Sequence, residues 1–118
     1  MQLKLGALKI MLATQSADFR KSIDGLCSLI TAELGHNTLD AVYVFYNKSR
    51  DKLKLIAWHH NGFILLYKRL EKGKFKLEKN PENPELLALN EKQISWLLAG
   101  LDWQLMSNCE EISFDNYH

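Results

Sequence analysis

The sequence predicts a single α/β domain of the α+β type, with a mainly antiparallel sheet of four or five strands and two principal helices. Three apolar runs, rich in β-branched and aromatic residues, follow one another between residues 42 and 67 and are separated by polar turns. One helical apolar pattern precedes these runs, and a second one follows them. At 118 residues and 47% hydrophobic composition, the chain can bury one core without disulfides or a structural metal. We therefore expect one domain over residues 1–103 and an acidic tail over residues 104–118.

The first expected elements are a short strand and a helix. Residues 9–13 form an apolar run that is typical of a strand, and residues 19–34 place apolar side chains at helical spacing. Gly35 can provide the left-handed residue that ends this helix. Gly25 lies inside the helix, where glycine costs about 1 kcal/mol relative to alanine. Either a close backbone contact or a different helix boundary is therefore implied.

The middle of the chain has the pattern of successive hairpins. Strands are expected at residues 42–46, 53–58 and 63–67, with a further short strand at 74–77. Asn61 and Gly62 favour a tight hairpin turn, because both central positions of such a turn require positive φ.

The last expected element is a helix after the proline-containing residues 80–84. Asn90 and Gln93 match a capping box, in which each side chain bonds the backbone of the other residue. Apolar residues then recur at helical spacing on one face, and Gly100 ends the pattern. These apolar residues are Ile94, Leu97, Leu98 and Leu101.

The charge of the chain is strongly polarised although its total is only +1. Residues 48–79 hold ten basic and three acidic residues, a net charge of +7, whereas the residues after Lys79 hold one basic and seven acidic residues, a net charge of −6. Such asymmetry points toward a polyanionic partner for the basic segment, or toward neutralisation of one segment by the other within the fold.

The candidate nucleic-acid contacts are the lysines and arginines of the basic segment and of the first helix. Lys52 and Lys54 are two residues apart on a predicted strand, so they share a face with Trp58, whose ring is available for stacking on an unpaired base. Alternatively, Trp58 is a core residue and the lysines protect an edge strand from pairing. The full set is Arg20, Lys21, Lys48, Arg50, Lys52, Lys54, Lys68, Arg69, Lys72, Lys74 and Lys76.

Arg20 and Lys21 are placed by the pattern in the first turn of the first helix. The helix dipole disfavours cations there, so two basic residues at this position suit a phosphate held by free backbone N–H groups and two positive side chains. The alternative is that they project into water or pair with Asp18 and Asp24.

Other classes of function lack support in the sequence. Cys27 and Cys109 are too few for a disulfide framework, and the adjacent His59 and His60 have no carboxylate or thiol nearby at metal-ligand spacing. No glycine-rich phosphate loop or nucleophile elbow is present. The first 16 residues are interrupted by lysine and are too short for a membrane span of roughly 20 residues. We expect a cytoplasmic protein with no catalytic residues, metal or cofactor.

Three ordered blocks give the chain a family resemblance. Residues 18–26, DFRKSIDGL, resemble a signature of the TnpB-type accessory proteins that insertion sequences of the sixty-six family encode beside their transposase. Residues 44–75 resemble the core of that family, through VFYN, RDKLK, NGF and YKRLEKGKF. Residues 97–103, LLAGLDW, resemble its closing motif.

The resemblance implies a role in transposition, a form of DNA recombination, in which the separate transposase carries out strand transfer. We expect a non-catalytic accessory protein that binds element-end DNA weakly and without sequence preference through a basic sheet face. The alternative is an adaptor that docks on the transposase or on another element-encoded protein, or that associates with itself through its charge polarity. No membrane partner is expected.

Overall fold

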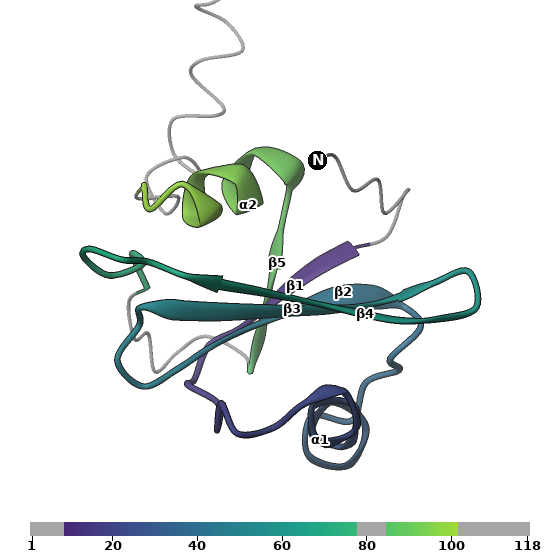
Figure 1. Ribbon diagram of the computed structural model, residues 1–118. Helices are drawn as coiled ribbons and strands as arrows, with labels where there is room; N and C mark the ends of the chain where they lie inside the picture. The colour runs from purple at the N-terminus through teal and green to yellow at the C-terminus, as the bar shows by residue number, and fades with distance from the viewer. Residues whose placement is uncertain (1–8, 78–84, 102–118) are drawn as a thin grey trace, which may run out of the picture.

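The computed structural model describes residues 9–77 and 85–101 and contains a five-stranded sheet with a helix on each face (Figure 1). The elements in chain order are β1 (Lys9–Ala13), α1 (Ile23–Ser28), the π-helical turn η1 (Leu29–Glu33), β2 (Ala41–Tyr46), β3 (Lys52–His59), β4 (Gly62–Arg69), β5 (Leu86–Leu89) and α2 (Glu91–Leu98).

The sheet has the strand order β4-β3-β2-β1-β5. Only β1 and β2 are parallel, joined by the α1 crossover, and the other three pairs are antiparallel. A parallel pair needs such a crossover, whereas β2, β3 and β4 follow one another through tight turns. The predicted α+β domain with a mainly antiparallel sheet is confirmed.

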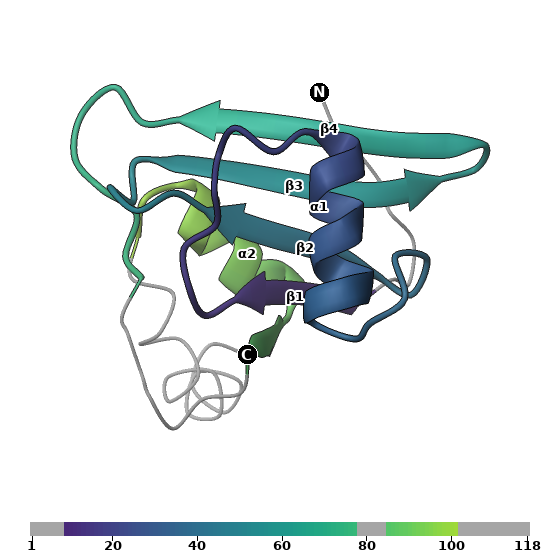
Figure 2. The same ribbon diagram turned by 90° about the horizontal axis from the view of Figure 1, so that it is seen from below.

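Strand β2 is the centre of the core, and all six of its residues are buried. Because successive side chains of a strand point to opposite faces, Tyr43 and Phe45 pack beneath α1, together with Leu26 and Ile30. Val44 and Tyr46 lie in the cluster that α2 covers with Leu97. Figure 2 shows α1 lying across the strands on its face of the sheet.

The first helix begins later than its apolar pattern predicts, at Ile23 rather than at residue 19. The backbone N–H of Lys21 bonds the carbonyl of Asp18, so residues 18–21 form a turn. The carbonyls of Phe19 and Lys21 accept hydrogen bonds from Lys54 of β3, as described below. These two carbonyls therefore bond a side chain of the sheet and not helical N–H groups, and residues 18–21 are held against the sheet.

Gly25 makes the close contact that its position inside the helix implies. A Cβ atom on this residue would lie 3.0 Å from Cβ and 3.1 Å from Cγ of Lys21. The absence of a side chain therefore lets the aliphatic stem of Lys21 lie directly over α1.

Residues 74–77 do not form the expected strand, although Phe75 and Leu77 are both buried in the core beneath α2. The fifth strand is instead β5, which pairs antiparallel with β1 from Leu86↔Ala13 to Leu89↔Ile10. The segment at 74–77 is held by Arg50, whose carbonyl accepts from Phe75 N at 2.7 Å and whose Nη1 donates to Leu77 O at 2.8 Å.

The β3–β4 turn lies one residue earlier than the Asn61-Gly62 pattern predicts. His59 pairs with Gly62, so His60 and Asn61 are the central residues, and His60 adopts a φ of 57°. The second helix begins as its pattern predicts: Asn90 and Gln93 form the capping box, and Gly100, with a φ of 78°, follows the helix end. Leu101 was expected on the buried face with Ile94, Leu97 and Leu98, but it is 50% exposed because the helix ends at Leu98.

Candidate nucleic-acid interface

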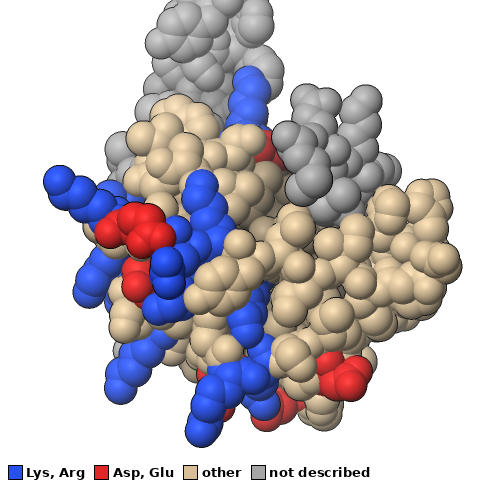
Figure 3. Space-filling view, viewed as in Figure 1, with Lys and Arg blue, Asp and Glu red and all other residues tan. Residues whose placement is uncertain are grey.

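The basic side chains gather at one end of the sheet, where β1, β2 and β4 end and β3 begins. In Figure 3 they lie mainly on the side where β4 ends, and the opposite side carries few of them. Four segments meet there: the loop before α1, the β2–β3 turn, the end of β4 and residues 70–77. We call this region the basic end; it holds Arg20, Lys21, Lys48, Arg50, Lys52, Lys54, Lys68, Arg69, Lys72, Lys74 and Lys76.

Most of the predicted contacts are accessible to a ligand. Lys21, Arg50 and Lys52 are partly buried, and Lys54 is buried. The others are exposed: Arg20, Lys48, Lys68, Arg69, Lys72, Lys74 and Lys76. The fold brings Arg20 and Lys21 beside basic residues that follow them by about 30 to 50 positions in the sequence. The charge pattern alone did not predict this proximity.

The β2–β3 turn is fixed by the side chain of Asn47. Its Oδ1 accepts from the backbone N–H of Asp51 at 3.1 Å and of Lys52 at 3.0 Å, and its Nδ2 donates to the Asp51 carboxylate at 2.7 Å. That last hydrogen bond is the main reason why the pKa of Asp51 lies below its usual value. Arg50 adopts a φ of 62° in this turn and binds the carbonyl of Leu77. Its charge therefore has a structural role.

Lys54 is also structural, and its burial departs from the expectation of a basic side chain that faces a phosphate. It is 8% exposed, and its Nζ donates to the carbonyls of Phe19 at 2.8 Å and Lys21 at 2.7 Å. The same ammonium lies 4.9 Å from the centroid of the Phe19 ring and 5.9 Å from that of Tyr67. Lys54 does share a sheet face with Lys52, as predicted, but it holds the loop before α1 on that face.

The loop before α1 presents Arg20 and Lys21. The Arg20 guanidinium donates to both carboxylate oxygens of Asp18, with the shortest contact at 2.8 Å, and its side chain is 92% exposed. These side-chain hydrogen bonds, together with one from the Arg20 backbone, lower the pKa of Asp18 to about 2. The expectation that both residues lie in the first helical turn is wrong, since α1 begins at Ile23.

The basic residues of β4 and the following loop also have local partners. Arg69 pairs with Glu71 at 2.8 Å, and Lys52 pairs with Asp51 at 3.3 Å. Lys68 donates to the carbonyl of Leu98 at the end of α2. Exposed ion pairs such as Arg69–Glu71 are typically worth less than about 1 kcal/mol, so a phosphate can displace this carboxylate at little cost.

The exposed aromatic side chain of the basic end is Tyr67, which sequence reasoning missed. It is 52% exposed and lies opposite Lys54 in the β3–β4 register. Trp58, the aromatic candidate of the sequence, is partly buried and lies opposite Phe63 near the other end of the hairpin. The one sequence signal that could have identified Tyr67 is strand alternation, which places Tyr67 and Arg69 on the same face of β4.

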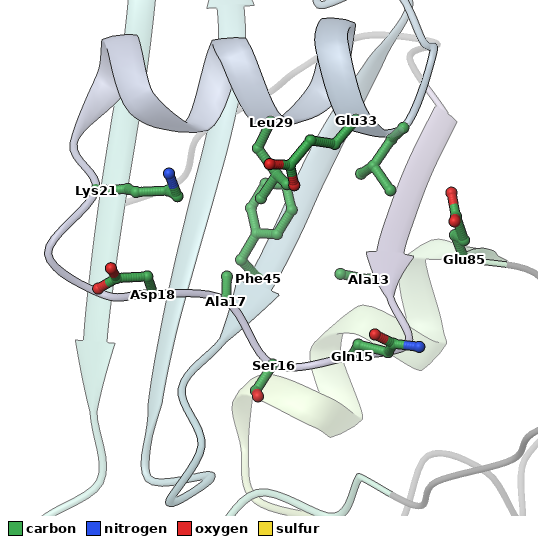
Figure 4. Close-up of a pocket in the computed structure, with 11 residues that line it drawn as sticks. Ala13, Gln15, Ser16, Ala17, Asp18, Lys21, Leu29, Glu33, Phe45 and Glu85 are labelled. Carbon is green, nitrogen blue, oxygen red and sulfur yellow. The ribbon is translucent and has the colours of Figure 1, made fainter.

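A pocket of about 250 Å³ lies beneath the loop before α1. Figure 4 shows the side chains of Asp18, Lys21, Glu33 and Glu85 around it, and Phe45 in its interior. Three carboxylates and one ammonium give the lining an acidic character, so this pocket does not suit a phosphate.

Within 9–77 and 85–101, no group of three histidine, cysteine, aspartate or glutamate side chains could hold a metal ion. The His59 and His60 rings lie edge to face, with centroids 4.2 Å apart. On α1, burial raises the pKa of the Cys27 thiol. None of the helices in these ranges has the length and apolar composition needed to cross a bilayer.

Comparison with known proteins gives one family and two relatives. Residues 8–108 match the IS66 Orf2-like proteins. The chain is 40% identical over 97 residues to the uncharacterised protein y4jC of Sinorhizobium fredii, covering 81% of each chain. It is 31% identical over 98 residues to the uncharacterised protein y4hO of the same organism, covering 82% of this chain and 84% of the relative. No solved structure matches.

Proposed function

Because the chain belongs to the family of IS66 Orf2-like proteins, we propose that it is an accessory protein of IS66 transposition that binds DNA through its basic end. The observation that carries this proposal is the convergence of four segments into one accessible basic surface, which includes Lys48, Lys52, Arg69 and Lys72. Strand transfer itself is left to the transposase, and we assign this chain no catalytic residue.

The chemistry of the surface favours contacts to the DNA backbone. Lysine and arginine side chains on turns and strand ends reach phosphates, which carry no sequence information directly. Beside the basic end, α1 lies across the sheet (Figure 2) and carries no lysine or arginine between Ile23 and Ser28, so we do not expect this helix to read bases in a major groove. We therefore expect weak binding to element-end DNA, with little sequence preference, at a site that excludes Arg50 and Lys54.

A salt titration tests this proposal. Each phosphate contact contributes about −0.9 to the slope of log affinity against log salt concentration, so four lost contacts reduce the slope by about 3.6 at most. Changing Lys48, Lys52, Arg69 and Lys72 to glutamine should weaken binding to every duplex by a similar factor and flatten the slope. Binding is measured by fluorescence anisotropy with labelled element-end and unrelated duplexes.

Two single variants serve as controls. Lys9 lies at the start of β1, at the opposite end of the sheet, and Lys92 lies on α2; both are exposed. Lys9→Gln and Lys92→Gln should leave affinity and slope nearly unchanged. An unaltered slope in the fourfold variant would remove the basic end from DNA binding.

A protein-adaptor function is the second candidate, and exposed apolar side chains near the end of α2 favour it. Trp96 is 39% exposed and Leu101 is 50% exposed, and the N–H of Leu101 bonds the carbonyl of Trp96. A pull-down with the cognate transposase tests it: Trp96→Ala should reduce capture if this patch docks on the transposase, and equal capture would exclude the patch. The acidic tail expected over residues 104–118 lies outside the described residues, and its contact with the basic segment remains a prediction.

A further inference from the structure

Tyr67 is a large aromatic residue that the fold leaves half-exposed within the basic end. Its accessible fraction is 52%, against 1–5% for the aromatic residues of β2. It precedes Arg69 by two residues and therefore points to the same face of β4. Its cross-strand partner is Lys54, and Arg69 lies opposite Lys52. An accessible ring thus lies on the same face as the exposed Arg69 and the partly exposed Lys52.

The ring is held in place by its neighbours. The Phe19 ring meets it edge to face, with centroids 6.3 Å apart and an interplanar angle of 60°. The Lys54 ammonium lies 5.9 Å from its centroid and is itself fixed by two backbone carbonyls. A ring with such contacts loses less conformational entropy when a ligand stacks on it than a ring without them.

Basic residues lie near this ring on the hairpin and in the loop before α1. Arg69 and Lys52 continue the strands, and Arg20 and Lys21 follow Phe19 in the loop that contacts Tyr67. A ring for stacking, flanked by cations that can track a phosphate backbone, is the combination by which proteins bind single strands without sequence preference.

A duplex cannot use the ring in the same way. Its bases are stacked on one another and present only their edges in the grooves, whereas an unpaired base has an accessible face. The structure also separates this role from Trp58, whose ring packs edge to face on Phe63 with centroids 5.1 Å apart, toward the opposite end of the sheet.

We propose that Tyr67 is a stacking platform for an unpaired base, and that the ligand of the basic end includes single-stranded DNA. This inference rests on the proposed DNA-binding function and specifies the strandedness of its substrate. Lys54 is a positioning residue in this arrangement, since it orders the Phe19 loop and the Tyr67 ring without reaching the ligand.

The test compares a poly-dT strand with the same strand annealed to poly-dA. Tyr67→Leu should lose about 5- to 160-fold in affinity for the single strand, the range expected for one stacked base, and little for the duplex. Its salt slope should stay unchanged, because no charge is removed. Tyr67→Phe keeps the ring and should bind both ligands like the parent protein, and Trp96→Leu provides a control at an exposed aromatic residue on α2.

A second measurement uses the unaltered protein and therefore does not depend on whether a variant folds. Photocrosslinking of the unaltered protein to a strand that contains 5-iodouracil should modify Tyr67, as identified by mass spectrometry of peptides. Crosslinks confined to other residues would overturn the inference, as would equal losses on strand and duplex for Tyr67→Leu, or an unchanged affinity for both.

The two proposals fail separately. If the fourfold glutamine variant loses affinity and slope while Tyr67→Leu binds the single strand normally, the stacking platform is refuted and backbone binding stands. If the fourfold variant keeps its slope on both ligands, the DNA-binding function itself is refuted.

Discussion

Replacing Lys54 by methionine tests whether one buried ammonium holds the loop before α1 on the sheet. The change removes two hydrogen bonds, at 2.8 and 2.7 Å, and the cation–π contacts to Phe19 and Tyr67. Charge-assisted hydrogen bonds are worth about 1.5–3 kcal/mol each, and cation–π contacts about 0.5–2 kcal/mol. Methionine in turn avoids the cost of burying a charge, which offsets part of the loss.

We expect Lys54→Met to lower the free energy of unfolding by about 2–4 kcal/mol, since removing one partner leaves the carbonyls of Phe19 and Lys21 without their donor. For a domain of this size, each kcal/mol shifts Tm by about 4 °C, so the melting temperature should fall by about 8–16 °C. Circular dichroism measures the melting curve, and hydrogen exchange should show faster exchange at residues 18–22.

Lys52→Met is the matched control, because Lys52 lies on the same strand and face. Its side chain is 31% exposed, and its ion pair with Asp51 spans 3.3 Å. Ion pairs near the protein surface are typically worth about 1 kcal/mol or less. If Lys54→Met melted at the temperature of the parent protein, or if both variants lost the same stability, the loop would not depend on the buried ammonium.

The remaining predictions concern one ion pair and one helix cap. Hydrogen bonds from Arg20 lower the pKa of Asp18 from 3.8 to about 2, so the folded state favours the carboxylate; the resulting stabilisation is complete above pH 3.8 and is lost as the pH falls toward 2. Asp18→Asn should flatten the dependence of Tm on pH in this window, and an unchanged dependence would show that the pair does not form in solution. Asn90→Ala removes the side-chain cap of α2 and should lower the free energy of unfolding, measured by urea denaturation, by about 1 kcal/mol. Asn90→Asp keeps a capping oxygen and should retain most of the parent protein's stability.

The elements that the sequence predicted well are those whose signal is local. Strands β2, β3 and β4 have apolar and aromatic runs bounded by turns, and α2 has its capping box and a terminal glycine within one short segment. Strand β5 was missed because four residues, LLAL, next to a proline-containing segment carry no periodicity that separates strand from loop. Its strand conformation depends on the free edge of β1, to which it pairs.

The start of α1 could not be predicted from the sequence for a different reason. Apolar spacing continues back to Phe19, so the local pattern favours a helix there, but the carbonyls of Phe19 and Lys21 are bound by Lys54, which follows them by 35 and 33 residues. The same contact decides which basic residues can reach a ligand. Strand alternation correctly placed Lys52 and Lys54 on one face of the sheet. It could not show that the loop before α1 covers Lys54 and leaves Lys52 partly exposed.

Specific contacts join the described parts of the sequence blocks that carry the family resemblance. Lys54 of the second block binds the backbone of the first, and Lys68 of the second block donates to the carbonyl of Leu98 in the third. Within the second block, the carbonyls of Arg50 and Asp51 accept hydrogen bonds from Phe75 and Leu70 of the YKRLEKGKF stretch. These contacts use backbone carbonyls as acceptors, so they fix the shape of the loops and leave most of the other basic side chains exposed. Some basic residues therefore build the surface, and others are available for a ligand. Charge counting along the chain merges these two groups, and only burial and hydrogen bonding separate them.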